Sequence, residues 1–485
     1  MDIAPQHLLI DGELVDAADG REYDNINPAT EEVAGTAPDA GPRDVERAVA
    51  AARRAFDQGR WATDVEFRRH CLTQLQDQLR KDVETIRAAH TVESGMPVGV
   101  AYAMGVDAPI EALGYWPELL RTYEWEHELP SVTEFRGVRS KRVVRKEPAG
   151  VVSAITPWNY PFQLNLAKIG HALAAGCTVV LKPAPETPWS GTLLAAAAAQ
   201  TDLPPGVLNV ITTSDNAVAE VLTTHPEVDQ ITFTGSTATG RLVMRNASET
   251  IKRVSLELGG KSAAIVLDDA DLPSAVAAAA GVVCLHAGQG CVLMTRLLVP
   301  RSLLAQATEI AAAVMPQIPY GDPNDMNNLM GPLVSRRQLD RVLGYLEVGR
   351  QEARLVTGGG RAEQFERGYY VQPTVFTDVP ATARIAREEI FGPVLSIIPF
   401  EDDADAVRIA NDSSYGLSGA VYSGDPERAL RVARGLRTGS VAINGGNFQA
   451  PDTPFGGYKQ SGIGREFGVQ GFEDFLETKA LGIPV

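Results

Sequence analysis

The sequence is poor in cysteine and histidine and contains no closely spaced metal-binding motif. Its 485 residues include 4 cysteines and 7 histidines, and no two cysteines are spaced as Cys-x-x-Cys. This scarcity argues against a disulfide framework and against a zinc site, so we expect no metal ion. Isolated cysteines are typical of reduced thiols in a reducing compartment, which favours a cytoplasmic protein.

Long apolar runs and an excess of basic residues are also absent. The longest apolar stretch, residues 275–285, is well short of the ~20 residues of a membrane-spanning helix. A secretory leader requires a basic residue near its start, and no Lys or Arg precedes Arg21. The net charge of −17 repels nucleic acid and anionic membranes, and a basic run from Arg136 to Lys146 alternates with valines as an exposed hairpin does. We therefore expect neither nucleic acid nor a membrane as a partner.

What the sequence does contain is a regular alternation of short apolar runs and helical patterns. The chain is long enough for two or three domains, and a helix-rich segment that includes residues 45–56 comes first. The alternation predicts strands at 151–155, 178–181, 208–211, 231–233 and 254–258, with helices at 166–175, 191–199, 217–224 and 238–246. Such a pattern predicts an α/β fold with a mainly parallel sheet covered on both faces.

The pattern begins again after Gly260. Strands are expected at 263–267 and 296–299, separated by an Ala-rich helix and followed by another helix from Leu303. A second α/β domain is therefore predicted. Residues 478–485 are short and apolar and suit an edge strand, which could pair with the basic hairpin across a subunit boundary.

Polar loops follow several of the expected strands. They are Thr156-Pro157-Trp158-Asn159, Lys182-Pro183-Ala184-Pro185 and Thr234-Gly235-Ser236. Ligands of a doubly wound sheet bind outside the carboxyl ends of its strands, so these loops predict a cofactor site. Gly235 and Ser236 open a helix whose N-terminus could hold a phosphate, although a strand-to-helix turn needs glycine in any case. Lys182 is either a ligand presented by a rigid loop or a solvated strand tip.

Three side chains have the chemistry of covalent catalysis. Cys291 lies in Gly288-Gln289-Gly290-Cys291, where flanking glycines leave a thiol and its backbone N–H accessible, whereas the other three cysteines suit core packing. Asn159 lies in a largely apolar loop and either holds its own turn or donates to an oxyanion. Glu257 ends an apolar strand and is either paired structurally or tuned as a base by desolvation.

Taken together, these segments resemble the aldehyde dehydrogenase superfamily from about Asn27 to the C-terminus. The resemblance rests on long motifs in a fixed order, with Glu257 placed 34 positions before Cys291 as in that family. The motifs are Pro157-Trp158-Asn159-Tyr160-Pro161, Leu256-Glu257-Leu258-Gly259-Gly260-Lys261, Gly288-Gln289-Gly290-Cys291, Glu388-Glu389-Ile390-Phe391-Gly392-Pro393, Asn411-Asp412-Ser413-Ser414-Tyr415-Gly416-Leu417 and Pro454-Phe455-Gly456-Gly457-Tyr458-Lys459.

The resemblance implies a fold of two Rossmann-like, doubly wound α/β domains with a small β oligomerisation element. It places an NAD(P)-binding domain at 1–125 and 149–259, a catalytic domain at 260–459, and an oligomerisation hairpin and C-terminal strand at 130–148 and 460–485. By the same resemblance, the protein is a homodimer or homotetramer.

The resemblance also implies a reaction and its residues. Cys291 adds to an aldehyde, Asn159 and the Cys291 backbone N–H hold the oxyanion, a nicotinamide takes the hydride, and Glu257 activates the water that releases the acid. Lys168 and Glu466 match proton-relay positions, although a surface ion pair explains them equally well. Lys182 would bind the adenosine ribose, Trp158 and Ser236 the pyrophosphate, and Glu389 the nicotinamide ribose. The remaining cofactor residues would be Ile155, Thr156, Pro157, Pro185, Glu186, Gly235, Leu258 and Phe391.

Two departures from the family pattern bear on specificity. The carboxylate that binds both ribose hydroxyls is expected three residues after Lys182, where Pro185 stands, and Glu186 follows one position later. We expect NAD, with NADP possible, because Glu186 could swing in and no extra Arg neighbours Lys182 in sequence.

Ala167 replaces an Arg of some semialdehyde dehydrogenases, so we expect a roomy apolar tunnel for neutral aliphatic or aromatic aldehydes. Its walls would be Tyr160, Leu164, Ala167, Val292 and Phe455.

Three other functions compete with this interpretation. A CoA-acylating relative would pass the thioester to CoA and lack the base, but Glu257 is present. A catalytically silent binding or structural homologue would keep the fold alone, but Asn159, Glu257 and Cys291 are all present. A cysteine hydrolase would need a histidine in a neighbouring motif to activate the thiol, and none is found there.

Overall fold

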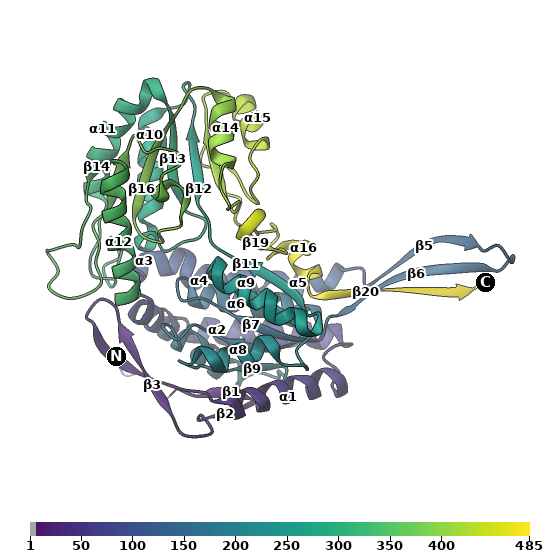
Figure 1. Cartoon of the computed structure of the whole chain (residues 1–485). Coiled ribbons are helices and arrows are strands. Elements are labelled where there is room, and N and C mark those ends of the chain that lie inside the picture. The colour runs from purple at the N-terminus through teal and green to yellow at the C-terminus, as the bar shows by residue number, and fades with distance from the viewer. Residues whose placement is uncertain (1–5) are drawn as a thin grey trace.

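A computed structural model of the protein describes residues 6–485 and shows two α/β bodies with a narrow sheet that projects from one of them (Figure 1). The first body contains an eight-stranded sheet in the order β19-β11-β10-β7-β8-β9-β1-β2. Its parallel strands are β7 (Val151–Ile155), β8 (Thr178–Lys182), β9 (Leu208–Val210), β10 (Gln230–Thr234) and β11 (Arg253–Glu257). The α/β fold predicted from the alternation is confirmed.

Helices cover both faces of this sheet, as apolar strands buried on both sides require. Those between the parallel strands are α6 (Pro161–Ala175), α7 (Trp189–Ala198), α8 (Asn216–Thr224) and α9 (Thr237–Ala247). The preceding helices are α1 (Pro42–Gln58), α2 (Val65–Ser94), α3 (Val98–Val100), the π-turn η1 (Ala101–Gly105), α4 (Asp107–Leu113) and α5 (Tyr115–Thr122). Helix α6 begins earlier than its sequence pattern indicated because Pro161 is favoured in the first helical turn. None of the helices in residues 6–485 is long and apolar enough to cross a membrane.

The N-terminal segment adds strands that its helical periodicity did not indicate. Strands β1 (Leu8–Ile10) and β2 (Glu13–Val15) extend the first sheet, with β1 antiparallel to β9. Strands β3 (Glu22–Asn27) and β4 (Glu32–Pro38) form a separate two-stranded sheet. Residues 1–5 of the predicted cofactor domain lie outside the described residues.

The second body contains a seven-stranded sheet in the order β14-β15-β16-β13-β12-β17-β18. The strands are β12 (Ser262–Val266), β13 (Met294–Pro300), β14 (Arg354–Thr357), β15 (Thr374–Thr377), β16 (Val394–Phe400), β17 (Gly419–Tyr422) and β18 (Ala442–Ile443). Only β14 is antiparallel to its neighbour. The helices are α10 (Leu272–Cys284), α11 (Leu304–Val314), α12 (Arg336–Glu352), α13 (Arg384–Arg387), α14 (Asp403–Asn411) and α15 (Pro426–Arg434), with short 3₁₀ turns between some elements. The predicted second α/β domain is present.

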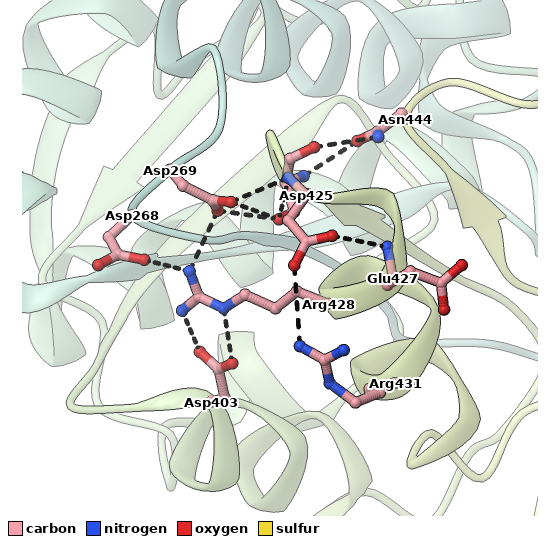
Figure 2. Close-up of polar contacts among 9 residues, drawn as sticks. Asp268, Asp269, Asp403, Asp425, Glu427, Arg428, Arg431 and Asn444 are labelled. Atoms are coloured by element: carbon pink, nitrogen blue, oxygen red, sulfur yellow. Dashed lines mark hydrogen bonds and ion pairs between the residues drawn. The ribbon is translucent and has the colours of Figure 1, made fainter.

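The carboxyl end of the second sheet is closed by an ion-pair network around Arg428 (Figure 2). The guanidinium donates to Asp268 at 2.6 Å and to Asp269 at 3.2 Å, just after β12, and to Asp403 at 2.6 and 2.8 Å. The order of the sheet reverses between β12 and β17, where a doubly wound sheet has room for a ligand. Here the protein's own arginine pairs with the carboxylates. The candidate catalytic residues Glu257 and Cys291 lie toward the opposite, amino end of these strands.

The projecting sheet is formed by β5 (Glu126–Thr133), β6 (Arg139–Pro148) and β20 (Leu476–Pro484), in the order β20-β6-β5 (Figure 1). The predicted C-terminal edge strand is therefore present and pairs antiparallel with the basic hairpin of its own chain. Residues 460–475 do not belong to this sheet, in contrast to the predicted boundary. Strand β19 (Gly462–Ile463) pairs with β11, and α16 (Gly468–Glu473) packs near α6, because this segment must cross the first body before β20 begins.

Candidate active site

The two bodies meet where the carboxyl ends of the first sheet face the amino ends of the second. The turn between β11 and β12 makes this contact: the Gly260 N–H donates to the Glu389 carboxylate at 2.8 Å. A Cβ at Gly260 would lie 2.3 Å from the carbonyl oxygen of Cys291, so only glycine allows so close an approach. The turn therefore brings Glu257, Glu389 and Cys291 to one place.

Cys291 follows a strained turn. His286, Ala287 and Gly288 have φ values of 46°, 54° and 74°, and a Cβ at Gly288 would lie 2.2 Å from the backbone of Gly392. Left-handed backbone at non-glycine residues costs free energy and is often found at functional sites. Burial raises the pKa of the Cys291 thiol, and the negative charges of Glu389 and Glu257 raise it further. The thiol therefore needs a proton acceptor, or a nearby positive charge, to become a nucleophile.

Asn159 lies beside this turn. Its buried side chain follows β7, and its amide nitrogen donates to the Gln289 carbonyl at 2.8 Å. The primary amide has a second hydrogen, which this contact does not use. Asn159 therefore does more than hold its own turn, because it binds the chain two residues before Cys291. Gln289 itself fixes the loop by accepting from the Val334 N–H at 2.9 Å, a contact that the sequence did not indicate.

Glu257 is the last residue of β11, and its side chain is buried. Neither of its carboxylate oxygens has a hydrogen-bond partner within residues 6–485. Burial raises its pKa well above the ordinary carboxyl value, and the charge of Glu466 acts in the same direction, whereas Lys168 lowers it. A Cβ at Gly456 would lie 2.7 Å from one Glu257 oxygen, so glycine leaves room beside the carboxylate. The interpretation of Glu257 as a structurally paired residue is therefore wrong.

Lys168 and Glu466 form an ion pair of 2.5 Å. Their side chains are only 1% and 5% exposed, so the alternative of a surface ion pair is wrong. A buried pair is costly to assemble and strongly sensitive to the loss of one partner. Lys168 comes from α6. Glu466 is held by Phe455, because the backbone N–H of each residue donates to the carbonyl of the other.

The loops predicted to bind a cofactor gather at the carboxyl ends of β7, β8 and β10. The Lys182 side chain is buried, and within residues 6–485 its ammonium makes no hydrogen bond or ion pair. Burial lowers its pKa to about 8, while the charge of Glu186 opposes that shift. Ser236 caps α9 by accepting from the Thr239 N–H, and Gly235 contacts the backbone of Glu257. A buried cation beside an exposed helix N-terminus fits a nucleotide with phosphates and ribose hydroxyls.

Glu186 would have to break an ion pair to turn toward a ribose. Its carboxylate accepts from the guanidinium of Arg337 at 2.9 Å. Arg337 lies in the first turn of α12 in the second body, and its side chain is 81% exposed. The absence of an extra arginine near Lys182 in sequence was therefore misleading, because the fold supplies one from a distant segment. Pro185 stands between Lys182 and Glu186 and offers no side-chain donor or acceptor.

The other expected cofactor residues lie around the same edge. Thr156 donates its backbone N–H to Lys182 and its hydroxyl to Asn165, and the Trp158 ring meets Phe391 edge to face at 5.4 Å. Glu389 lies at the Gly259–Gly260 turn, where burial raises its pKa. Ile155, Pro157 and Leu258 flank these residues at the ends of β7 and β11.

An apolar cluster lies next to the Asn159 loop. Tyr160 and Leu164 belong to it, as expected for the tunnel, whereas Ala167, Val292 and Phe455 lie outside it. Tyr160 also contacts the ring of His286, with 5.4 Å between ring centroids. The sequence did not indicate the other members, which come from the helical N-terminal segment, from the turn before Cys291 and from a distant loop: Met96, Val100, Ala101, Met104, Leu285 and Leu329.

The comparisons with known proteins agree with this geometry. Residues 14–481 match the model of the aldehyde dehydrogenase family. The chain belongs to that family. It is 46% identical to a 3-succinoylsemialdehyde-pyridine dehydrogenase from Pseudomonas sp over 98% of both chains, and 41% identical to geranial dehydrogenase from Castellaniella defragrans over 99% of both. As an aldehyde dehydrogenase, it oxidises aldehydes with a nicotinamide cofactor.

Solved structures show the same fold. An aldehyde dehydrogenase C variant from Pseudomonas syringae, with a cysteine changed to alanine and bound to NAD⁺ and octanal, is 40% identical with a TM-score of 0.93; the match covers 98% of this chain and 96% of that one. Betaine aldehyde dehydrogenase from Staphylococcus aureus, bound to NAD⁺, is 36% identical with a TM-score of 0.95, covering 99% and 94%. The predicted family is therefore confirmed.

Proposed function

We propose that this aldehyde dehydrogenase uses NAD⁺ and water to oxidise neutral aliphatic or aromatic aldehydes through a thioester on Cys291. The observation that supports it best is Glu257, a buried carboxylate whose two oxygens lack partners within the described chain and whose charge acts on Cys291. A carboxylate in this state is a strong acceptor for a proton, either from a thiol or from water. That property distinguishes hydrolysis from transfer of the acyl group to CoA.

The first half of the reaction forms a bond between Cys291 and the aldehyde carbon. Glu257 accepts the thiol proton, and the carbonyl oxygen becomes an oxyanion that accepts from the Asn159 amide and the Cys291 backbone N–H. The bound nicotinamide supplies the acceptor for the hydride. Lys182, Ser236 and Glu389 are the residues that would hold the cofactor, at the ribose, pyrophosphate and nicotinamide-ribose positions respectively.

The second half releases the product. Glu257 first passes the thiol proton on toward Glu466 and so becomes a carboxylate again. It then takes a proton from water, the hydroxide oxygen bonds to the thioester carbon, and the carbon–sulfur bond breaks to leave the acid and the Cys291 thiolate. The proton must then leave a buried carboxylate. Glu466 and Lys168, which lie close enough to shift the pKa of Glu257, form the route that we propose for it.

The apolar cluster around Tyr160 and Leu164 supports neutral substrates, as does Ala167 on α6 in place of an arginine. We expect hexanal and benzaldehyde to be oxidised with a higher kcat/KM than succinate semialdehyde, because the cluster offers apolar contacts and no cation for a carboxylate. The measurement is NADH formation over an aldehyde panel, with the acid quantified with and without CoA. A clear preference for succinate semialdehyde would contradict the substrate class. Dependence of turnover on CoA would favour the acylating alternative, and no NADH with any aldehyde would favour a silent homologue.

We propose NAD as the preferred cofactor, with NADP tolerated because Arg337 neutralises Glu186. An unpaired carboxylate would repel a 2′-phosphate, whereas a carboxylate in an ion pair repels it less. Arg337→Ala is therefore expected to raise the ratio of kcat/KM with NAD to that with NADP by roughly tenfold. Arg336→Ala is the matched control, since this neighbouring arginine bonds Glu31 instead. An unchanged ratio in Arg337→Ala would show that the ion pair has no part in cofactor choice.

We propose that the protein is a dimer or tetramer assembled through the projecting sheet. Leu481, Ile483 and Val485 share one face of the C-terminal strand by alternation and are exposed. Light scattering should give a multiple of the 51.9 kDa chain mass, and Ile483→Asp should shift the population toward monomer. Thr478→Asp, on the opposite face of β20, is the control. A monomeric wild-type protein would contradict the proposal.

We propose that the protein is cytoplasmic. All four cysteines are unpaired, and three of them are buried. Free thiols in this number are usual in a reducing compartment, which supports the location.

A further inference from the structure

A small cavity at the amino ends of β12 and β17 is lined by polar groups that have no partners. Lys261 immediately precedes β12, and Ser262 is the first residue of that strand. Ser418 immediately precedes β17. The Lys261 ammonium and both serine hydroxyls are buried and lack a hydrogen-bond partner anywhere in residues 6–485. Leaving three such groups unsatisfied together costs several kcal/mol in sum, at about 1–3 kcal/mol each, so the protein must gain a partner for them.

The surroundings of the cavity are positively charged. Arg296, which also lines it, donates to three backbone carbonyls: those of Lys261 at 2.8 Å, Ile409 at 3.1 Å and Ala410 at 2.9 Å. Neither Arg296 nor Lys261 forms an ion pair with a carboxylate in the described part of the chain. Burial, together with the charge of Arg296, lowers the pKa of Lys261 to about 7, and the charges of Glu389 and Glu388 oppose that shift. A buried cation without a counter-ion is unfavourable.

Other charged groups near this position do not supply the missing partner. Asp412 is bonded to Arg387, and Glu389 accepts from the Gly260 N–H. Lys459 adds a further positive charge close to Arg296 and donates to the carbonyls of Asn411 and Ser413. Glu388, whose charge also acts on Lys261, pairs with Arg384. The nearest carboxylates are therefore engaged elsewhere.

We propose that this cavity binds one monovalent anion of halide size, held by the Lys261 ammonium and the hydroxyls of Ser262 and Ser418. All three donors belong to residues that line the same cavity, and a chloride ion accepts hydrogen bonds from several donors at once. The cavity is small, with room for one monatomic ion or one water molecule, and it excludes phosphate and larger carboxylates. Asn411 and Tyr415 on its rim are only half-buried, which gives the ion a route to solvent.

The site is next to the catalytic turn. Gly416, on the cavity wall, donates its N–H to the Ser461 hydroxyl at 2.9 Å, and that hydroxyl donates to the Gly259 carbonyl at 2.7 Å. Lys261 directly follows Gly260, which contacts Cys291 and Glu389. A bound anion would tie Lys261 to Ser418 and so restrain the turn that places the nucleophile. This consequence goes beyond the proposed reaction, and binding can be measured without turnover.

The most direct test is diffraction at the bromine absorption edge from crystals of the full chain in sodium bromide. The proposal expects an anomalous peak within hydrogen-bond distance of the Lys261 nitrogen and the Ser418 oxygen. A non-anomalous water molecule in the cavity, or an empty cavity, would overturn it. The outcome does not depend on the substrate or the cofactor, so it is separable from a failure of the proposed function.

A second test follows stability in solution. At equal ionic strength, sodium chloride should raise the Tm of the wild type above that in sodium gluconate by roughly 2 °C, saturably with concentration. Ser418→Ala and Lys261→Met should abolish the difference; the serine variant preserves the charge and is less disruptive if the lysine variant does not fold. Ser423→Ala, just beyond the other end of β17 and bonded to Asp269, should retain it. An equal response in all variants would show a general salt effect and contradict the site.

Discussion

Cys291→Ala is expected to lower kcat/KM for aldehyde oxidation by a factor on the order of 10⁴ or more. Alanine has no sulfur to bond the carbonyl carbon, and hydride departure from a free aldehyde or its hydrate has no covalent tetrahedral intermediate to start from. The measurement is NADH formation with hexanal at saturating NAD⁺. Cofactor binding should be nearly unchanged, because Cys291 is not among the residues that we place at the ribose or the phosphates.

Cys284→Ala is the matched control for that variant. Cys284 lies in the same segment but is packed in the core of the second body, where its sulfur contacts Met315. Truncation there should lower the Tm and leave kcat/KM within a few-fold, since a small core side chain contributes packing and no chemistry. Equal losses in the two variants, or substantial oxidation by Cys291→Ala, would mean that the nucleophile is misassigned.

Glu257→Gln is expected to separate the two halves of the reaction. Deacylation should slow by roughly 10²–10⁴-fold, because glutamine cannot take a proton from water. Because Glu257 also accepts the thiol proton in the proposed reaction, the first turnover should slow as well but by less, and the ratio of the two effects measures its share in each step. Rapid-mixing measurements should show a burst of one NADH per site followed by a much slower steady state. Glu477→Gln, on the exposed face of β20, should behave as the wild type.

The pH dependence of the wild type follows from the same residue. Burial raises the pKa of Glu257, and only its deprotonated form can act as a base. The deacylation rate should therefore rise with pH through a midpoint well above the ordinary carboxyl pKa of about 4.3, and Glu257→Gln should lose this dependence. A wild-type profile that is flat through that range would contradict the assignment.

Much of the fold could be predicted because buried parallel strands leave a simple signature. Each of the five strands from 151 to 258 is a short apolar run separated by a helical pattern, and each forms within one or two residues of its expected bounds. The strands that were missed have no such signature. Strand β19 has two residues and pairs with β11, far away in sequence, so tertiary context determines its conformation. Strand β1 has three residues and pairs both with the adjacent β2 and with the distant β9, and it is too short for a clear alternation.

The catalytic residues were predictable for a different reason from the specificity residues. Cys291, Asn159 and Glu257 are recognisable because their own neighbours in sequence are unusual for a thiol, an amide or a carboxylate. Arg337 and Lys261 gain their significance from partners, or from the lack of partners, that only the folded chain reveals. An ion pair between Glu186 and α12 spans both bodies, and no local pattern encodes it.

The central claim is that a thioester on Cys291 is released by water under the control of Glu257. Its most direct test is peptide mass spectrometry of Glu257→Gln after mixing with hexanal and NAD⁺ and quenching in acid. The account predicts a hexanoyl adduct on the peptide that contains Cys291, at near-stoichiometric occupancy, and none when NAD⁺ is omitted. Absence of the adduct from a variant that still produces NADH, or its presence on another residue, would contradict the account.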